Sequence, residues 1–121
     1  AAFYSLQYVE IATEVESMRV KSGVTVTHLG AAVDDIDELA AIISALDLVI
    51  SVDNTVAHLA GALGKPVWTL LPCSPEWRYP RDGEVMPWYP SMRLFRRVRG
   101  DSWGPVIDRV AAELAVAARV K

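Results

Sequence analysis

The chain has 121 residues, of which 52% are hydrophobic and 22% charged, a balance typical of one globular domain and not of a disordered segment. Its single cysteine, Cys73, excludes an internal disulfide framework and a zinc site built from cysteines. No apolar run approaches the ~20 residues of a membrane span, and the start lacks the basic segment of a signal peptide, so we expect a cytoplasmic location. Because the chain begins with Ala1 and not with Met, we expect it to be a piece of a longer protein.

Charge is unevenly distributed along the chain. The net charge is −3, but residues 1–64 hold nine acidic and two basic side chains, whereas residues 65–121 hold six acidic and ten basic ones. Such asymmetry predicts a positive face on the second half and an anionic partner for it. Surface charge without any target accounts for the same counts equally well, so composition leaves both interpretations open.

Strands and helices alternate in the first part of the chain. Apolar and β-branched segments at 3–8 and 24–29 predict strands, and a loose apolar stripe predicts a helix over 9–20 between them. Asp35, with Glu38 three residues later, has the pattern of a capping box and predicts the start of a second helix. The apolar face of that helix consists of Leu39, Ile42, Ile43 and Leu46.

The middle of the chain continues this alternation. The apolar run at 48–52 is typical of a central parallel strand that is covered on both faces. Asp53, Asn54 and Thr55 are residues that can cap the next helix, and Gly64 suits the left-handed position after its end. The expected apolar stripe of this helix consists of Val56, Leu59, Ala60 and Leu63.

The last part of the chain contains a long loop between two strands. The apolar run at 67–71 predicts a buried strand, and residues 72–91, which hold five of the seven prolines, predict the loop. Alternation at 92–96 predicts a final strand. Asp101 and Ser102 can cap a final helix, whose apolar residues are Val106, Ile107, Val110, Ala111 and Leu114.

This order of elements predicts an α/β fold. We expect residues 1–121 to form a single Rossmann-like, three-layer α/β/α domain with a mainly parallel sheet of about five strands. In such sheets, ligands bind beyond the carboxyl ends of the strands. The candidate site segments are therefore Ser5–Tyr8, His28–Asp35, Val52–His58 and Pro72–Arg78.

Several common catalytic and cofactor motifs are absent from the sequence. It contains neither the G-x-G-x-x-G dinucleotide fingerprint nor the P-loop pattern. It also lacks the H-E-x-x-H zinc motif and the G-x-S-x-G nucleophile elbow. We therefore expect no resident cofactor and no dedicated metal site.

The segment Val52–His58 carries the strongest chemical signal. A helix that begins at the carboxyl end of a buried strand has unpartnered first amides and a positive dipole end. Thr55 adds a hydroxyl donor, His58 lies one turn further on, and a phosphate or pyrophosphate suits the point that both can face. The alternative is that Asn54 or Thr55 only caps the helix, Asp53 supports it and His58 is structural, and spacing leaves both readings open.

Residues 72–99 gather basic and aromatic side chains. The arginines are Arg78, Arg81, Arg93, Arg96, Arg97 and Arg99, and the aromatic residues are Trp77, Tyr79, Trp88, Tyr89 and Phe95. Arginine matches phosphate with a bidentate fork, and aromatic rings stack on bases or sugars. Because Trp77 and Arg78 follow a strand end on the ligand side, we favour a functional role for Arg78. We interpret Arg96, Arg97 and Arg99 as charges that protect an edge strand.

From Leu48 to Trp68 the sequence resembles the signature V-D-T-[SG]-x-x-H-L-A-x-A-x-x-x-P of glycosyltransferase family 9, which includes the lipopolysaccharide heptosyltransferases. It is most similar to the glycosyltransferase-like domain that follows tetratricopeptide repeats in many bacterial proteins. It is more weakly similar to the donor site of O-GlcNAc transferase. The other matching segments are Phe3–Gln7, Leu71–Arg78, Pro87–Arg96 and Gly100–Trp103.

The resemblance implies one half of a GT-B fold, in which two Rossmann-like domains face a cleft. This chain is similar to the C-terminal half, which binds the nucleotide sugar. The resemblance puts Thr55, Val56 and His58 at the donor diphosphate and Ser5 and Gln7 near it. The implied partners are a nucleotide sugar, an N-terminal GT-B half and tetratricopeptide repeats.

The implied function is that of the donor-binding half of an inverting, metal-independent glycosyltransferase. Asp53, Asn54, Trp77 and Arg78 complete the expected nucleotide site. His58 and Arg78 are the candidates for stabilising the leaving diphosphate. The general base is expected in the other half, so we expect residues 1–121 alone to be inactive.

Two departures from the family pattern favour an alternative. Asn54 stands where the family usually has Thr, and Tyr8-Val9-Glu10-Ile11 replaces a basic, Gly-rich turn. The alternative is a non-catalytic GT-B-like module that mediates protein interaction. A third reading, nucleic-acid binding through residues 77–99, is disfavoured by the net charge of −3, and we expect no nucleic-acid partner.

Overall fold

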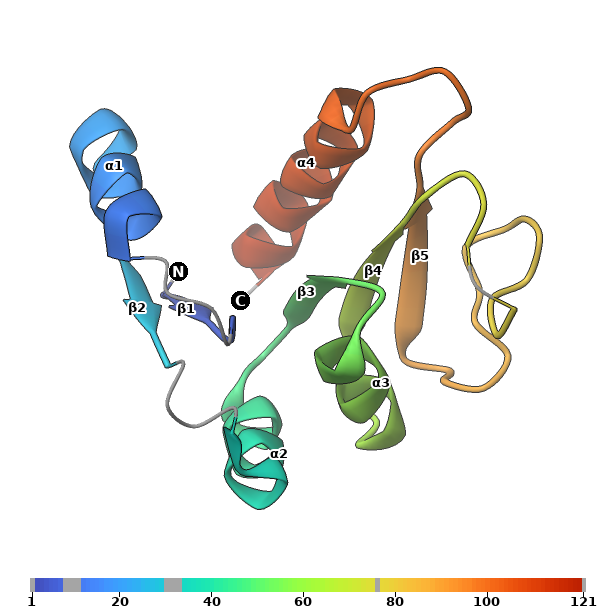
Figure 1. The fold of residues 1–121 in the computed structure, drawn as a ribbon, viewed down its shortest axis with the longest axis horizontal. Coiled ribbons are helices and arrows are strands. Elements are labelled where there is room, and N and C mark those ends of the chain that lie inside the picture. Colours follow the sequence, from blue (N-terminus) through green and yellow to red (C-terminus); the bar gives the residue numbers. More distant parts are fainter. Residues whose placement is uncertain (1, 8–11, 30–33, 76, 121) are drawn as a thin grey trace. The chain divides into compact units, whose positions relative to one another are not determined.

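A computed structural model describes residues 2–7, 12–29, 34–75 and 77–120, and its ribbon is drawn in Figure 1. Helices and strands follow one another in the predicted order. The elements are β1 (Phe3–Ser5), α1 (Ala12–Ser22), β2 (Val26–His28), α2 (Ile36–Ala45), β3 (Val49–Val52), α3 (Thr55–Ala62), β4 (Val67–Leu71), β5 (Met92–Arg96) and α4 (Gly104–Val120). The α/β, Rossmann-like class predicted from the sequence is therefore confirmed. Parts of the candidate segments Ser5–Tyr8 and His28–Asp35 lie outside the described residues.

The chain divides into two compact units, residues 1–42 and 43–121. In the first unit, β1 pairs in parallel with β2, and Ser5 lies opposite His28. Asp35 caps α2 as predicted, because its Oδ1 accepts hydrogen bonds from the amides of Asp37 and Glu38 at 2.9 and 3.3 Å. All the strand pairs are parallel, as predicted, but the described strands form a two-stranded sheet in the first unit and a three-stranded sheet in the second, so each sheet has fewer than five strands.

The second unit contains the parallel sheet in the order β3-β4-β5. β4 is the central strand of these three, and β3 pairs with β4 along one of its sides. In β3, Val49 is buried, but Ile50 and Val52 are 41% and 52% exposed. An apolar run indicates that a strand can be covered on both faces, but it does not specify which neighbours cover it.

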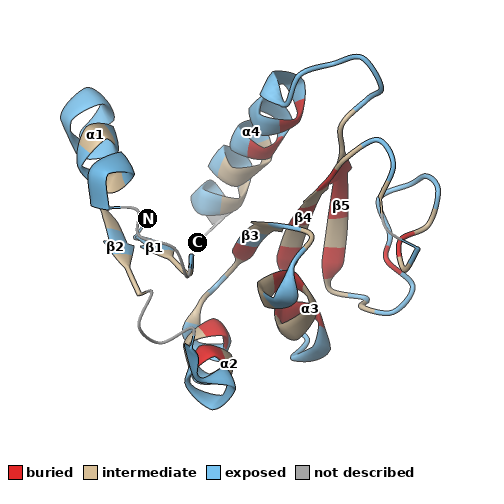
Figure 2. Cartoon of the chain, in the orientation of Figure 1, coloured by how far each residue is buried: buried red, intermediate tan, exposed pale blue. Residues whose placement is uncertain are grey.

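The core of the second unit lies on both faces of this sheet, as the buried residues in Figure 2 show. On one face, Phe95 of β5 packs with Val106 and Val110 of α4, and Trp68 and Leu70 of β4 border this cluster. On the other face, the alternating residues of β4 are also buried, namely Val67, Thr69 and Leu71. Each fully buried Val, Leu or Phe contributes about 1.5–3 kcal/mol to the free energy of folding. The sheet is therefore a stable support for the loops and the helix start at its edge.

Helix α3 packs against β3 and β4 and is held at both ends. Asn54 is its N-cap, as the sequence suggested. At the other end Gly64 has φ of +73°, and its amide donates to the carbonyl of Gly61, which completes the predicted left-handed stop. The predicted apolar stripe is confirmed in part: Ala60 is buried, and Val56 and Leu59 are half-buried, but Leu63 is 44% exposed. The other buried residues of α3 are Ala57 and Gly61. Small residues face inward because α3 lies close to its neighbours.

The loop of residues 72–91 is tied to β5 by arginine side chains. Arg96 donates to the carbonyls of Pro80 and Gly83 at 2.6 and 2.8 Å. Arg93 lies between Glu84 of the loop and Glu113 of α4, and these carboxylates raise the pKa of Arg93, Glu113 most strongly. These arginines hold the loop in place against the sheet. The sequence predicts Arg96 as a charge that protects an edge strand, whereas in the structure its guanidinium is bound to carbonyls of the loop.

Candidate functional site

The start of α3 presents two backbone amides that the helix itself does not use. The side chain of Asn54 accepts a hydrogen bond from the amide of Ala57 at 3.2 Å. Ser51 donates to the same Asn54 oxygen at 3.0 Å and thereby fixes its orientation. The amides of Thr55 and Val56, at the first two positions of the helix, have no acceptor within the helix. Together with the helix dipole, they make this end attractive to an anion.

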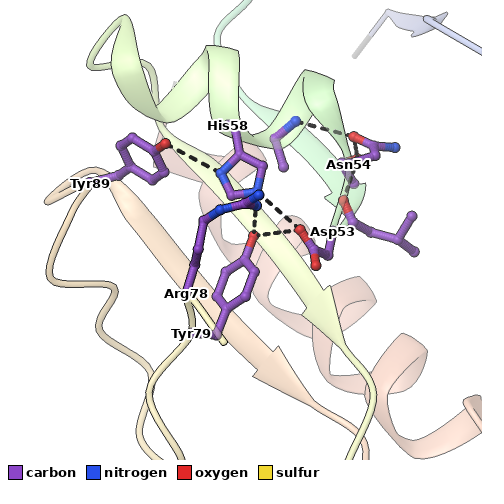
Figure 3. Close-up of polar contacts among 9 residues, drawn as sticks. Asp53, Asn54, His58, Arg78, Tyr79 and Tyr89 are labelled. Carbon is purple, nitrogen blue, oxygen red and sulfur yellow. Dashed lines mark hydrogen bonds and ion pairs between the residues drawn. The ribbon is translucent and has the colours of Figure 1, made fainter. Parts of the chain in front are cut away.

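His58, one turn into α3, is surrounded by polar and aromatic side chains of three segments (Figure 3). Its Nε2 lies 3.1 Å from Oδ1 of Asp53, the residue that directly follows β3. Its Nδ1 lies 3.3 Å from the hydroxyl of Tyr89. The rings of Tyr79 and Tyr89 lie 5.8 and 5.7 Å from the imidazole, measured between centroids. His58 is thus at the centre of a packed cluster.

The loop after β4 supplies Arg78 and Tyr79 to the same cluster. Tyr79 is only 5% exposed, and its hydroxyl donates to Oδ1 of Asp53 at 3.0 Å. The Nη1 of Arg78 lies 3.3 Å from Nε2 of His58. The Tyr79 side chain is therefore buried within the cluster, whereas the guanidinium of Arg78 lines the open pocket.

An open pocket of about 550 Å³ lies in front of the α3 start. Its lining residues are Asp53, Asn54, Thr55, His58, Arg78, Trp88 and Tyr89. The volume falls in the range of small-molecule sites, and the lining brings a guanidinium, a helix N-terminus and an aromatic ring together. The carboxylate of Asp53 is the one negative group in this lining, and it already accepts a hydrogen bond from Tyr79 and contacts His58. Such a pocket suits a ligand with both anionic and ring parts.

Two exposed tryptophans mark the rim of the pocket. Trp88 is 54% exposed and Trp77 is 78% exposed, although indoles normally bury most of their surface. Their rings are 5.7 Å apart between centroids and meet edge to face. The guanidinium carbon of Arg78 lies 5.4 Å from the centroid of the Trp77 ring, a cation–π distance. The rim therefore combines aromatic surface with positive charge.

The structure brings five of the predicted site residues together in this pocket: Asp53, Asn54, Thr55, His58 and Arg78. Val56 follows Thr55 in α3 but is not among the lining residues, and Trp77 lies beside the rim. Ser5 and Gln7 belong to the first unit, where the Ser5 hydroxyl lies 3.2 Å from Nδ1 of His28 and accepts a hydrogen bond from the Gln7 amide. Their place in a shared nucleotide site stays a prediction.

Sequence reasoning did not assign Tyr79, Trp88 and Tyr89 to the site. All three were visible as aromatic residues of a proline-rich loop, but a loop has no periodicity from which a direction could be derived. A usable signal was Gly61 inside a helix, because glycine there indicates a close approach by another group. In the structure a Cβ at Gly61 would lie 2.5 Å from Cγ of Tyr89. The glycine thus allows the Tyr89 ring to reach His58.

No group of three or more His, Cys, Asp and Glu side chains in the described part of the chain is arranged to hold a metal ion. None of the helices within the described ranges combines the length and apolar character needed to cross a bilayer.

The chain is similar to a protein family and to a protein of known name. The family model for glycosyltransferase family 9 (heptosyltransferase) matches residues 10–102, which include the whole α3 start and Arg78. Protein FlbA of Caulobacter vibrioides is 36% identical over 115 residues, which are 93% of this chain and 19% of that protein. The chain thus spans about a fifth of the length of this relative. No solved structure matches.

Proposed function

This chain belongs to glycosyltransferase family 9, the heptosyltransferase family, and on that basis we propose that it binds the diphosphate of a nucleotide-sugar donor. In this proposal it forms the donor half of an inverting, metal-independent enzyme. The observation that carries the proposal is the pocket at the α3 start, where Thr55 and Arg78 face the same space.

Phosphate oxygens accept hydrogen bonds from the amides of Thr55 and Val56, from the Thr55 hydroxyl and from the Arg78 guanidinium. The helix terminus contributes about 0.3–1 kcal/mol, or about 2 kcal/mol when partly buried, and each charged hydrogen bond about 1.5–3 kcal/mol. Micromolar affinity needs about 8 kcal/mol after association costs. These groups alone therefore give roughly high-micromolar to millimolar affinity, and a second domain that closes over the donor supplies the rest.

The proposed reaction is a displacement at the anomeric carbon of the sugar. The acceptor oxygen forms a bond to this carbon from one side while the bond to the diphosphate oxygen breaks on the other, which inverts the configuration. The nucleoside diphosphate leaves with the electron pair, and a base on the N-terminal GT-B half takes the acceptor proton. The role of this chain is to stabilise the charge that grows on the leaving diphosphate. Arg78 and the α3 amides do this with fixed positive groups and without a metal ion.

The proposal is tested by titrating the natural protein that carries this chain with ADP, UDP, GDP and CMP. Replacement Arg78→Ala removes a charged hydrogen bond and should weaken binding of the preferred nucleotide about ten- to a hundredfold. Arg81→Ala is the matched control, because Arg81 is an exposed arginine of the same loop that does not line the pocket. Equal affinities of the two variants, or no binding of any nucleotide at millimolar concentration, would contradict the proposal.

One observation favours a second candidate, the non-catalytic module. Asn54 is engaged as a helix cap and both ring nitrogens of His58 lie near protein partners, so the cluster is satisfied without a ligand. In that case the natural protein binds no nucleotide but binds a protein partner through this domain. The same nucleotide titration, repeated beside a measurement of partner binding, separates the two functions.

A further inference from the structure

We infer that His58 is a positioning residue whose two ring nitrogens are committed to Asp53 and Tyr89. Tyr79 and Tyr89 are then further positioning residues of this site. The role that this gives His58 toward a nucleotide rests on the proposed function, whereas the hydrogen bonding of its ring does not. In Figure 3, side chains from the α3 start and from the loop meet around the imidazole.

The position of the ring hydrogen follows from the partners. Asp53 Oδ1 lies 3.1 Å from Nε2, and a carboxylate can only accept, so Nε2 carries a hydrogen. In the neutral form of an imidazole that carries its hydrogen on Nε2, Nδ1 is an acceptor. Tyr89, whose hydroxyl lies 3.3 Å from Nδ1, can donate to it. The opposite tautomer would let Nε2 accept from Arg78 at 3.3 Å, but it would turn the Nε2 lone pair toward the closer Asp53 carboxylate at 3.1 Å, and it is therefore disfavoured.

Tyr79 also holds the Asp53 carboxylate in place. Its buried hydroxyl donates to the same Asp53 oxygen at 3.0 Å, so the carboxylate is fixed from two directions. The hydroxyl is also 3.5 Å from Nε2 of His58, and the ring stacks at a tilt of 42° against the imidazole. Asp53, His58 and Tyr79 are thus one unit that ties the end of β3, the first turn of α3 and the loop together.

The same assignment defines the contact between His58 and Arg78. Because Nε2 carries its hydrogen toward Asp53, it offers no lone pair to the Arg78 nitrogen 3.3 Å away. The imidazole therefore acts as a spacer between the guanidinium and the helix. A bound diphosphate is contacted by Arg78 and by the α3 amides, while His58 keeps these groups at the right separation and donates no hydrogen bond to the phosphate.

Nitrogen-15 NMR of histidine-labelled natural protein tests the assignment, with the His58 signals identified by their absence in His58→Gln. The expected spectrum shows Nε2 protonated and Nδ1 unprotonated, both without nucleotide and at the highest nucleotide concentration reached. Tyr89→Phe removes the donor to Nδ1 and should shift that signal, whereas Tyr4→Phe, in an exposed residue of the first unit, should leave it unchanged. A proton on Nδ1, or a Tyr89→Phe spectrum like that of the parent, overturns the inference.

Nucleotide affinity provides the second test. The amide of glutamine offers one donor and one acceptor, so His58→Gln should keep nucleotide affinity within about threefold of the parent. His58→Leu, which offers neither, should lose affinity about tenfold or more, because Arg78 and Asp53 are no longer held. A folded His58→Gln variant that loses as much affinity as Arg78→Ala would show that the imidazole itself touches the ligand. If the parent binds no nucleotide, the proposed function fails, and the ring spectrum alone decides the inference.

Discussion

Gly61 of α3 lies so close to the Tyr89 side chain that no Cβ fits between them without a displacement. A Cβ added there would lie 2.5, 2.8 and 2.9 Å from Cγ, Cδ2 and Cβ of Tyr89. Carbon atoms in contact normally lie about 3.5–4.0 Å apart, so the Tyr89 ring must move by about 1 Å to admit Gly61→Ala. That displacement moves the Tyr89 hydroxyl away from its position 3.3 Å from Nδ1 of His58.

Two opposing effects set the size of the change. Overpacking in a close contact costs about 1–3 kcal/mol, and loss of the hydrogen bond to His58 adds about 1 kcal/mol. Alanine in place of glycine inside a helix contributes about 0.8–1 kcal/mol in the other direction. The free energy of unfolding should therefore fall by about 1–3 kcal/mol in Gly61→Ala.

Urea unfolding of Gly61→Ala, Tyr89→Ala and the double variant measures this coupling. Tyr89→Ala removes Cγ and Cδ2 but keeps the Cβ that would lie 2.9 Å from the added methyl group, so in this background Gly61→Ala should cost clearly less than in the parent. Gly104→Ala is the control for an added methyl group at a helix residue, because its Cβ would lie 3.4 Å from Ser102 Oγ, an ordinary contact. An equal loss of stability with and without the Tyr89 ring would refute the reasoning.

Three further predictions concern the surroundings of the pocket. Asn54→Ala removes the cap of α3 and should lower the free energy of unfolding by about 1 kcal/mol, whereas Asn54→Asp, which keeps an accepting oxygen, should preserve most of it in the same denaturation assay. Arg93→Met breaks the ion pairs to Glu84 and Glu113 and should cost at most about 1 kcal/mol, because these groups are partly exposed; a cost that does not shrink at high salt in thermal melts contradicts this. Trp88→Ala removes ring surface from the pocket and should weaken nucleotide binding about fivefold or more but leave pyrophosphate binding unchanged in calorimetric titration; equal effects on both ligands would count against stacking.

Local chemistry explains what could be predicted of the fold. Asp35, Asn54 and Gly64 each satisfy a need at a helix end that depends on a few neighbouring residues, and the structure confirms all three. The alternation at 92–96 likewise predicts β5, although burial follows the two-residue period throughout only in β4, because Leu94 and Phe95 of β5 are both buried.

The errors have a different origin, because they depend on contacts between distant segments. The run at 48–52 indicates a covered strand, but nothing in it states which strands will flank it. The predicted stripe of α3 includes the buried Ala60 but not Ala57 and Gly61, and a Cβ at Gly61 would meet the Tyr89 ring. Hydrophobicity alone does not report how close two elements come.

In the candidate site, too, residues in local patterns could be predicted, whereas residues brought in by distant segments could not. The α3 start and Arg78 could be found from the sequence because each follows a strand at its carboxyl end, where ligands of parallel sheets bind. Tyr79 and Tyr89 reach His58 only through the path of a 20-residue loop, Pro72–Ser91. No local pattern encodes that path, and its consequence for His58 became visible only in three dimensions.

The central claim is that a diphosphate binds at the N-terminus of α3. Amide NMR of the natural protein, labelled with nitrogen-15 in threonine and valine and titrated with the preferred nucleoside diphosphate, reports on this point directly. The account predicts that the Thr55 and Val56 amides shift with a common saturation curve, and that Arg78→Ala weakens this curve. Shifts that saturate elsewhere while Thr55 and Val56 stay unchanged would contradict it.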